Sequence, residues 1–489
     1  MNLVSLLDEQ AERNPDQLAL ADGKSRLTFG ELLDASVSGA QVLKDVGLRK
    51  GDAVLFFHPV KVELYTSLLS VIRAGMIAVF VDPSAPPSFI EECCGLVRPK
   101  GFFGSAKAHL LRLKIPGMRG IPVRFHTGRI PVPGSKRWLP NKGTLGESLA
   151  SIKGGETALI TFTSGSTGKP KGVARSHEFL IAQHKALESS LNLKSGDIDL
   201  VTLPVFVLAN LASGTSSIIA DTNLARPGEI AQEAVAKQIV EEKISRIVAS
   251  PAFFESLLGN GGCSFDGVES VYTGGAPVFP RLLSKMKKSF PNASVTAVYG
   301  STEAEPIAEI SFDQISSGDL DTMKNGGGLL AGVPVPEIEL QILDGEILVT
   351  GDHVLKSYLN GKGDSETKVN IDGVIWHRTG DLGRVDESGR LWLLGRKSAL
   401  IGDVKPFSVE CAASFLSESG RTAVIEWQGE AVLVAATDAG GNADLESLAQ
   451  SFGINRVLRI AKIPMDRRHN AKVDYPALLG EMERRFKRV

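Results

Sequence analysis

The residues best suited to chemistry form one short segment, TFTSGSTGKPKGV, from Thr161 to Val173. An apolar run, ETALITFT, leads into the loop and predicts a buried strand. Glycines let backbone N–H groups turn toward an anion, hydroxyl groups donate to it, and lysines add positive charge. These features belong to Thr163, Ser164, Gly165, Ser166, Thr167, Gly168, Lys169 and Lys171. The segment therefore predicts a loop that binds a polyphosphate.

The loop is not of the Walker A type. That motif has four residues between its glycines and a Ser or Thr after the Lys. Here two residues separate Gly165 from Gly168, and Pro170 follows Lys169. This spacing argues against phosphoryl transfer by a kinase of that class. A polar surface loop is the alternative that composition alone allows, but the ordered pattern of thirteen positions favours a binding loop.

The segment resembles the signature of the adenylate-forming superfamily, which includes acyl-CoA synthetases, luciferases and the adenylation domains of peptide synthetases. Further motifs of that family follow in the family's order along essentially the whole chain. The resemblance implies an enzyme that uses ATP and Mg²⁺ to convert a carboxylic acid into an acyl-AMP, with release of pyrophosphate.

Two motifs in the second half are similar to the family's adenine and α-phosphate segments. The first would lie along the adenine and consists of Gly274, Gly275, Ala276 and Pro277. The second is Tyr299, Gly300, Ser301, Thr302 and Glu303. The resemblance implies that its aromatic ring stacks on the base, that Thr302 meets the α-phosphate and that Glu303 binds Mg²⁺. A carboxylate suits that ion because Mg²⁺ prefers hard oxygen ligands.

Three later residues complete the site that the resemblance implies. Asp381, in a Thr-Gly-Asp motif, would accept hydrogen bonds from both ribose hydroxyls. Arg396 follows Gly395 at the family's hinge and would also reach the ribose. Lys472 occupies roughly the place of the catalytic lysine, a compact charge that can stabilise displacement at the α-phosphorus. Taken singly, Asp381 would be a turn residue and Lys472 a solvated surface residue, so the inference depends on the order of the whole set.

The elements that must position these residues predict an α/β fold. Helix and strand patterns alternate over the first part, which indicates helix-covered sheets with parallel strands. From about residue 330 to 395, short strands with tight turns predict a β-rich subdomain. After Gly395 a smaller α/β segment begins. We expect an N-terminal domain over 1–395 and a small mobile C-terminal domain over 396–489, with ATP in the cleft between them.

The composition indicates an ordinary cytoplasmic protein. Lys plus Arg number 54 and Asp plus Glu number 56, so the net charge gives no reason to expect nucleic acid or an anionic membrane as a partner. The four cysteines lack zinc-ligand spacing and favour a reduced compartment. Residues 199–221 lack charge between Asp199 and Asp221, but Pro204 and Asn210 favour a buried helix and loop over membrane contact.

The fate of the adenylate is left open between two chemistries. Many family members have an aromatic-His pair where Phe206-Val207 stands here, and the segment RKSALIGDVKPFSVE lacks the glycine turn that lines a pantetheine tunnel. The segments VIWHRTGDLGRVDESGRLWLLGRK and DRRHNAKVDYPAL are similar to the β-lactone synthetases of bacterial olefin biosynthesis. This likeness implies a β-hydroxy fatty acid whose hydroxyl attacks the acyl-AMP.

Two alternatives remain. An acid–thiol ligase would load coenzyme A or an acyl carrier protein, and a non-catalytic nucleotide-binding protein would merely retain the fold. The sequence does not identify the acid substrate. Candidate positions that would line its pocket are Phe206, Leu208 and the range Val271–Thr273. The stretch from Val205 to Asn210 has no acidic residue to recognise an amino group, which favours an apolar acyl chain.

Overall fold

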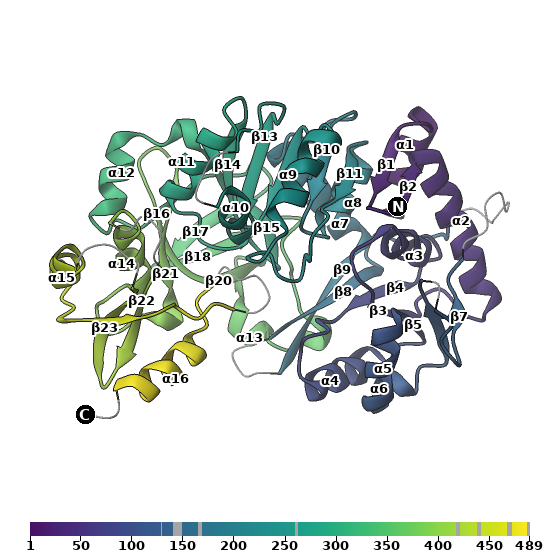
Figure 1. The fold of residues 1–489 in the computed structure, drawn as a ribbon. Helices are drawn as coiled ribbons and strands as arrows, with labels where there is room; N and C mark the ends of the chain where they lie inside the picture. Colours follow the sequence, from purple (N-terminus) through teal and green to yellow (C-terminus); the bar gives the residue numbers. More distant parts are fainter. Residues whose placement is uncertain are drawn as a thin grey trace. The chain divides into compact units, whose positions relative to one another are not determined.

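The computed structural model describes residues 1–128, 130–139, 149–164, 169–259, 263–416, 421–437, 442–466 and 472–486. The chain forms two compact units (Figure 1). The first contains Met1–Ala220 and Asp352–Ile375, and the second contains Asp221–Gly351 and Trp376–Val489. The boundary predicted at residue 396 falls inside the second unit, so a separately moving 396–489 domain stays a prediction.

The first unit is built around a sheet with the strand order β7-β6-β5-β3-β4-β8-β9. All neighbouring pairs are parallel except β8 and β9, which form an antiparallel hairpin. A second group of strands has β1 between β2 and β11, with β10 parallel to β11. The strands are β1 (Leu18–Ala21), β2 (Arg26–Thr28), β3 (Ala53–Phe57), β4 (Ile77–Phe80), β5 (Gly101–Gly104), β6 (Val123–His126), β7 (Lys136–Arg137), β8 (Thr157–Ser164), β9 (Pro170–Ser176), β10 (Ile198–Val201), β11 (Ser216–Ile219) and β19 (Lys368–Ile371).

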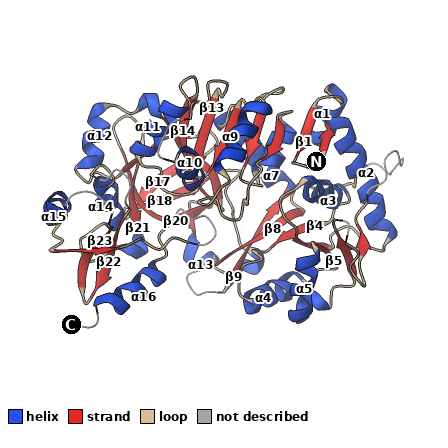
Figure 2. Ribbon diagram, in the orientation of Figure 1, coloured by secondary structure: helices blue, strands red, loops and turns tan. Residues whose placement is uncertain are grey.

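Helices cover this sheet on both faces, as the alternating sequence pattern predicts (Figure 2). Phe102 and Phe162 belong to a core shared with the helices α4 to α6. On the opposite face, Trp138 packs edge-on against Phe125 and directs its indole nitrogen toward Thr66 of α3. The helices are α1 (Ser5–Arg13), α2 (Phe29–Asp45), α3 (Val62–Arg73), α4 (Pro87–Val97), α5 (Ala106–Lys114), α6 (Pro116–Arg119), α7 (His177–Ser190), α8 (Phe206–Ala212), η2 (Leu359–Gly361) and α13 (Asp364–Thr367).

The uncharged stretch 199–221 forms buried secondary structure, as expected. It contains the end of β10, the helix α8 and the strand β11, and Asn210 of α8 donates to Asp199 at 2.7 Å in the core. Within the described residues, no helix is both long enough and apolar enough to cross a bilayer.

The second unit contains a run of strands ordered β12-β13-β14-β15-β16-β21-β20-β18-β17 and a separate sheet β22-β23-β24. The pairs β12–β13 and β13–β14 are parallel, and those from β14 to β17 are antiparallel. The strands are β12 (Arg246–Ala249), β13 (Ser270–Gly274), β14 (Ser294–Ser301), β15 (Ala304–Ser311), β16 (Leu329–Pro334), β17 (Glu339–Leu343), β18 (Glu346–Thr350), β20 (Val374–Val385), β21 (Leu391–Arg396), β22 (Thr422–Trp427), β23 (Glu430–Ala436) and β24 (Arg456–Ile460). The β-rich region predicted from about 330 to 395 is thus present.

The C-terminal part of the second unit has a hydrophobic core of its own. Its members include Val409, Trp427, Leu433, Leu445 and Met482. The helix α14 also contributes Cys411 to a cluster with Trp392 and Leu329, which joins this part to the preceding strands. The helices of the unit are α9 (Gln232–Glu241), α10 (Pro251–Leu258), α11 (Pro280–Ser289), η1 (Phe312–Gln314), α12 (Ser317–Lys324), η3 (Lys397–Ala399), α14 (Pro406–Ala413), α15 (Asn442–Ser451) and α16 (Tyr475–Phe486).

Candidate active site

The predicted phosphate segment connects the two strands of the β8–β9 hairpin. Thr163 lies opposite Lys171, and Ser164 lies opposite Pro170, so the ladder continues to both ends of the connection. Gly165, Ser166, Thr167 and Gly168 fall outside the described residues, as does the side chain of Ser164. The strand predicted before this segment is confirmed.

The two lysines of this segment have different surroundings. Lys169 is exposed, whereas the side chain of Lys171 is 12% exposed. The Lys171 ammonium group bonds Glu366 of α13 at 2.6 Å and lies 5.9 Å from the centre of the Tyr358 ring. A carboxylate therefore lies against the lysine that the sequence assigns to phosphate binding, a contact across 195 residues that no local pattern signals.

In the second unit, Asp381 lies between two of the other predicted site residues. The Tyr299 hydroxyl donates to its Oδ2 at 2.6 Å, and Arg396 forms an ion pair with it, with Nε 2.9 Å from Oδ1. The structure thus brings together three residues that are far apart in sequence. Because β20 and β21 are antiparallel with Asp381 opposite Arg396, the sheet register places the two side chains side by side.

The charge state of Asp381 results from opposing effects. Burial raises the pKa of this carboxyl, and the positive charges of Arg396 and Lys472, with the bond from Tyr299, counter part of that increase. Burial and the neighbouring Asp381 raise the pKa of the Tyr299 phenol well above its ordinary value, so this hydroxyl remains a donor. The arrangement is a hydrogen-bond acceptor with two cations close to it.

The backbone around Asp381 is fixed by its own strand ends. Gly380 has φ of 74°, a left-handed conformation that favours glycine. The Thr379 hydroxyl accepts from Asp381 N at 3.0 Å and donates to Ile347 O at 2.9 Å, while Arg396 donates to Thr379 O at 2.9 Å. The Thr-Gly-Asp motif therefore forms a turn locked to β18 and β21.

A buried carboxylate, Glu346, supports the same two strands. It accepts from Arg378, three residues before Asp381, and from Lys397, one residue after Arg396, the latter at 3.2 Å. Burial alone would raise the pKa of Glu346, but these two cations lower it below the ordinary value. Glu346 was not predicted, because in the sequence it is simply a polar residue at the start of a strand.

The segment 299–303 forms the end of β14 and the turn into β15. Glu303 N donates to the Ser301 hydroxyl at 3.3 Å, and Ser301 pairs with Ala304 in the ladder. Thr302 is exposed and Glu303 is half-buried. Gly300 leaves little room for a side chain, since a Cβ there would come within 3.1 Å of Ala304 O.

The predicted adenine segment follows the strand β13. A Cβ at Gly274 would lie 2.5 Å from Val298 O on the next strand, so only glycine fits this close approach. Gly275 has φ of 79°, and Ala276 and Pro277 continue along the surface before α11. The segment and Tyr299 lie on adjacent strands, because β13 and β14 pair in parallel with Gly274 opposite Val298.

Lys472 lies on a small hairpin of the C-terminal part. Met465 and Val473 form an antiparallel bridge, Lys472 N donates to Asp466 Oδ1 at 2.8 Å, and Asp466 N donates to Lys472 O at 2.8 Å. The Lys472 side chain is exposed, and its charge counters part of the rise that burial causes in the pKa of Asp381. The backbone is thus held while the ammonium group stays accessible.

The residues of the site suit a metal ion that arrives with a nucleotide. Within the described ranges, no group of three or more His, Cys, Asp and Glu residues could hold a metal ion alone. Mg²⁺ commonly needs only one or two carboxylates, with phosphate oxygens and water as its other ligands. Glu303, half-buried beside the exposed Thr302, fits that requirement.

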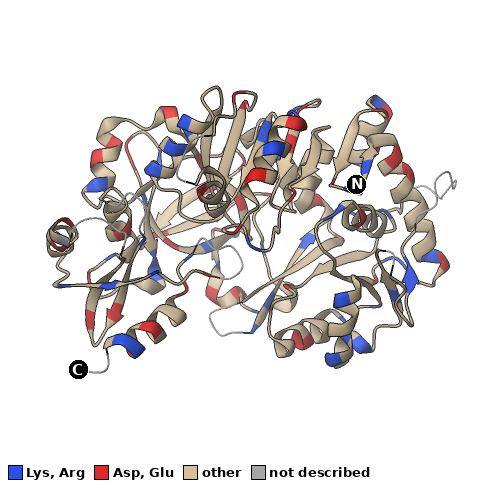
Figure 3. Ribbon diagram, in the orientation of Figure 1, with Lys and Arg blue, Asp and Glu red and all other residues tan. Residues whose placement is uncertain are grey.

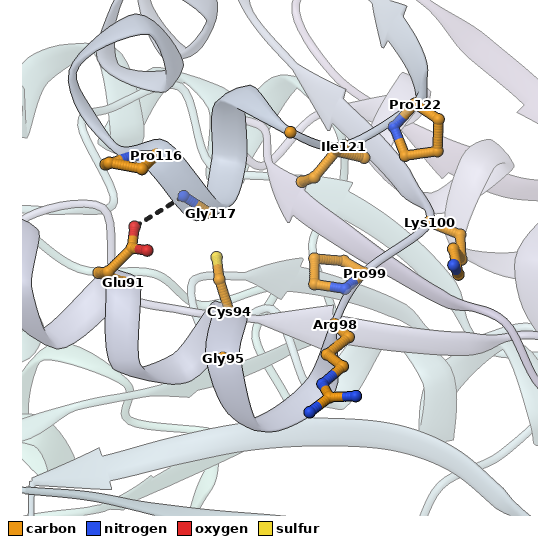
Figure 4. Close-up of a pocket in the computed structure, with 11 residues that line it drawn as sticks. Glu91, Cys94, Gly95, Arg98, Pro99, Lys100, Pro116, Gly117, Ile121 and Pro122 are labelled. Atoms are coloured by element: carbon orange, nitrogen blue, oxygen red, sulfur yellow. Dashed lines mark hydrogen bonds between the residues drawn. The ribbon is translucent and has the colours of Figure 1, made fainter.

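A separate hollow of about 310 Å³ lies in the first unit, between α4 and α6 (Figure 4). Glu91 and Cys94 line one side, and Arg98 and Lys100 line another. None of the described residues of the predicted site lines it. The hollow therefore does not contribute to the nucleotide site inferred above.

This fold is that of the adenylate-forming enzymes. It aligns with the crystal structure of the anthranilate CoA ligase AuaEII in complex with anthranoyl-AMP, with a TM-score of 0.83, 18% identity and coverage of 99% of this chain and 97% of that one. Residues 7–359 match the model of the AMP-binding enzyme family. The chain belongs to that family, which confirms the α/β fold and the resemblance predicted from the sequence.

Curated relatives agree with this assignment, one of them over nearly the full length of both sequences. The chain is 27% identical over 550 residues to an olefin β-lactone synthetase of Stenotrophomonas maltophilia, covering 99% of each sequence. It is 25% identical over 449 residues to a mitochondrial medium-chain acyl-CoA ligase of Mus musculus, covering 81% of this chain and 71% of that relative. The chain is therefore an enzyme of the ATP-using, adenylate-forming class that activates a carboxylic acid through an acyl-adenylate.

Proposed function

We propose that this enzyme activates an apolar carboxylic acid, with Asp381, Arg396 and Lys472 as the central groups of its nucleotide site. The observation that carries the proposal is the Asp381 carboxylate, which accepts a hydrogen bond from Tyr299, forms an ion pair with Arg396 and is influenced by the charge of Lys472. Retention of these groups favours a catalyst over a protein that only binds a nucleotide.

Asp381 would take the ribose of ATP. Each carboxylate oxygen can accept more than one hydrogen bond, so both ribose hydroxyls can donate while Arg396 stays close. The Tyr299 ring would stack on the adenine that lies along Gly274–Pro277. The hydroxyl groups and lysines of residues 163–171 would receive the β- and γ-phosphates.

Activation is one in-line displacement at phosphorus. A carboxylate oxygen of the acid attacks the α-phosphorus, the bond to the pyrophosphate oxygen breaks, and the products are acyl-AMP and pyrophosphate. Thr302 and Lys472 would stabilise the negative charge that develops on the α-phosphoryl oxygens. A bound Mg²⁺, held by Glu303, would neutralise phosphate charge.

We infer that the acid is a fatty or β-hydroxy fatty acid. The helix α8 has no charged side chain, and Phe206 and Val207 are buried while Leu208 is half-buried, an apolar setting that suits an alkyl chain. A full-length relative described as an olefin β-lactone synthetase supports closure of the adenylate to a β-lactone. In that step the substrate's hydroxyl oxygen attacks the acyl carbon, AMP leaves, and the hydroxyl proton is lost.

Transfer to a thiol is the second candidate. A relative described as a medium-chain acyl-CoA ligase favours coenzyme A as acceptor, and an acyl carrier protein would offer the same thiol chemistry. We place the enzyme in the cytoplasm, because Cys93, Cys94, Cys263 and Cys411 are all free thiols.

Acid-dependent exchange between ATP and labelled pyrophosphate tests the proposal. Fatty, β-hydroxy fatty, aryl and amino acids would be compared with the same enzyme. We expect exchange with the two fatty classes and background exchange with amino acids. Exchange that is strongest with an amino acid would overturn the acid assignment, and no exchange with any acid would overturn the proposed site chemistry.

A further inference from the structure

The charges of the first unit are strongly segregated along the chain. Between Cys93 and Gly146 there are eleven Lys and Arg residues and no Asp or Glu, in a protein whose overall net charge is −2. Glu91 and Glu92 precede this segment and Glu147 follows it. The near-neutral total therefore conceals one markedly basic region, which balanced charges elsewhere offset.

The fold gathers much of this charge on the side of the sheet covered by α5 and α6. On β6, Arg124 and His126 flank Phe125, which stacks on the opposite face, so both point toward α5. Burial lowers the pKa of Arg112 on α5, and the positive charge of Arg124 lowers it further. Burial and Arg137 act likewise on the pKa of His126. Like charges thus lie close enough to repel one another.

The outer face of α5 combines lysines with exposed leucines. Lys107, Leu110, Leu113 and Lys114 recur at helical spacing and are all exposed, with Leu110 at 65% and Leu113 at 54%. The inner face carries Ala108, His109 and Arg112, which are buried.

Two neighbouring elements extend this positive surface. Arg119 of α6 is exposed, as is Arg137 of the edge strand β7. Figure 3 shows Lys and Arg on α5, on α6 and beside β7. Arg98 and Lys100 lie near the same helices, at the hollow between α4 and α6 (Figure 4).

We propose that this basic face, defined by Lys107, Leu110, Leu113, Lys114, Arg119 and Arg137, docks the enzyme on an anionic phospholipid bilayer. Leucines flanked by lysines on one helix face suit the interface of a membrane, where apolar side chains enter the acyl boundary and cations meet the headgroups. The two exposed leucines, which are neighbours on one helix face, favour a bilayer over nucleic acid, because nucleic acid binding would need only the positive charges. Binding is peripheral, and it revises the expectation drawn from the net charge.

Vesicle cosedimentation of the full-length enzyme tests this surface. Vesicles of phosphatidylcholine alone would be compared with vesicles that also contain phosphatidylglycerol, at low and high salt. We expect binding to the anionic vesicles only, weakened by salt. Each cation near an anionic surface strengthens binding about fivefold, so Lys107→Gln, Lys114→Gln and Arg119→Gln together should weaken it on the order of 100-fold.

Leucine variants and a matched helix separate docking from nonspecific charge. Leu110→Ser with Leu113→Ser should weaken binding without removing its salt dependence. The control is Lys237→Gln with Val240→Ser on α9, a lysine and an apolar residue that are equally exposed, with Val240 at 68%. This variant should bind vesicles as the unchanged protein does. Thermal melting confirms that each variant is folded.

Three results would overturn the proposal. They are equal binding to neutral vesicles, unchanged binding by the α5 variants, and retention by an acidic carrier protein or nucleic acid without any vesicle binding. Vesicle binding does not depend on turnover, so failure of the proposed acid activation and failure of membrane docking give different readouts.

Discussion

At the scale of single residues, Asp381 has the surroundings of a recognition group more than of an acid or base. One of its oxygens already accepts a hydrogen bond from the Tyr299 hydroxyl, and the other forms an ion pair with the Arg396 guanidinium. The preceding Gly380 has a left-handed backbone conformation that forms a tight turn. Such a carboxylate is held rigidly before the nucleotide arrives. Rigidity of this kind lowers the entropy cost of binding.

Asp381→Ala should weaken ATP binding, because the two ribose hydroxyls lose their shared acceptor. Hydrogen bonds to charged groups contribute about 1.5–3 kcal/mol, so the dissociation constant should rise by roughly one to two orders of magnitude. Isothermal titration with ATP measures this, and Asp403→Ala, at an exposed turn, serves as the control. Equal ATP affinity in both variants would remove Asp381 from the site.

Lys472→Ala should affect chemistry far more than nucleotide binding. Its side chain is exposed on a hairpin, and we expect it to meet the phosphate only when the C-terminal part closes. Loss of one preorganised charge should reduce the exchange rate by about 10²–10³-fold, with little change in ATP affinity. Lys462→Ala, another exposed lysine of the same part, should retain activity. A fall in affinity that matches the fall in rate would assign Lys472 to ground-state binding instead.

The residues of the site were largely predictable by type, but their contacts were not. The motif order indicated Tyr299, Asp381 and Arg396 one by one. The bond between Tyr299 and Asp381 joins residues 82 positions apart. Lys171 pairs with Glu366 across 195 positions, and Glu346 pairs with Arg378 across 32 positions. Such pairs depend on which strands become neighbours, which periodicity does not specify.

At the scale of elements, the strands next to the predicted motifs agree with the sequence. The apolar run before the predicted phosphate loop forms β8, because buried strands have a clear apolar signature. The helix α16 and the strand β24 were not predicted. Gly480 weakens the helix pattern of α16, and Arg456 and Arg459 weaken the apolar pattern of β24. Both elements therefore depend on packing, since Leu478 and Ile460 are buried in the C-terminal core.

Glu410 of α14 gives the C-terminal part a pH-dependent stability. Its carboxyl accepts from Val424 N at 2.9 Å and lies 3.4 Å from the Tyr475 hydroxyl, so it joins α14 to β22 and α16. Burial raises its pKa from 4.5 to about 7. The folded state then keeps a proton that the unfolded chain releases, and stability falls as pH rises from about 4.5 to about 7.

Glu410→Gln should remove this dependence. At pH above 7 the variant should be more stable than the unchanged protein by about 1–3 kcal/mol, because the neutral amide avoids the cost of a buried charge. Thermal melting at acidic and mildly alkaline pH measures the difference. Glu426→Gln, exposed on β22, should leave the pH dependence intact. Identical pH profiles for the Glu410 variant and the unchanged protein would contradict the assignment.

At the scale of the whole molecule, the net charge is a poor guide to function. The net charge of −2 gave no sign of the basic segment between residues 93 and 146, because acidic residues elsewhere compensate for it. The fold class was predictable, since the alternation of helix and strand patterns recurs along the chain and does not depend on any single element. The allocation of residues 352–375 to the first unit was not, because it requires the chain to leave that unit and return.

The fate of the acyl-adenylate is a property of the whole enzyme. It distinguishes the two proposed chemistries, closure to a β-lactone and transfer to a thiol. A β-hydroxy acid carries its own nucleophile, and intramolecular attack benefits from a high effective concentration when the hydroxyl is held near the acyl carbon. We expect a β-hydroxy fatty acid to turn over without any thiol, giving AMP and a β-lactone. The 3-deoxy acid lacks that nucleophile and should stop at the adenylate.

Mass spectrometry of both reactions, with and without coenzyme A, identifies the products. The segment 396–410 motivates the expectation, because its sequence is shorter than the family pattern and lacks the Lys-x-x-Gly order that the resemblance associates with a pantetheine tunnel. Its one glycine, Gly402, lies in the turn between Ile401 and Val404. The 3-deoxy acid is the matched control, since it differs from the substrate by one oxygen atom. Rapid thioester formation from the 3-deoxy acid, with no lactone from the hydroxy acid, would reverse the order of the two chemistries and make the enzyme an acid–thiol ligase.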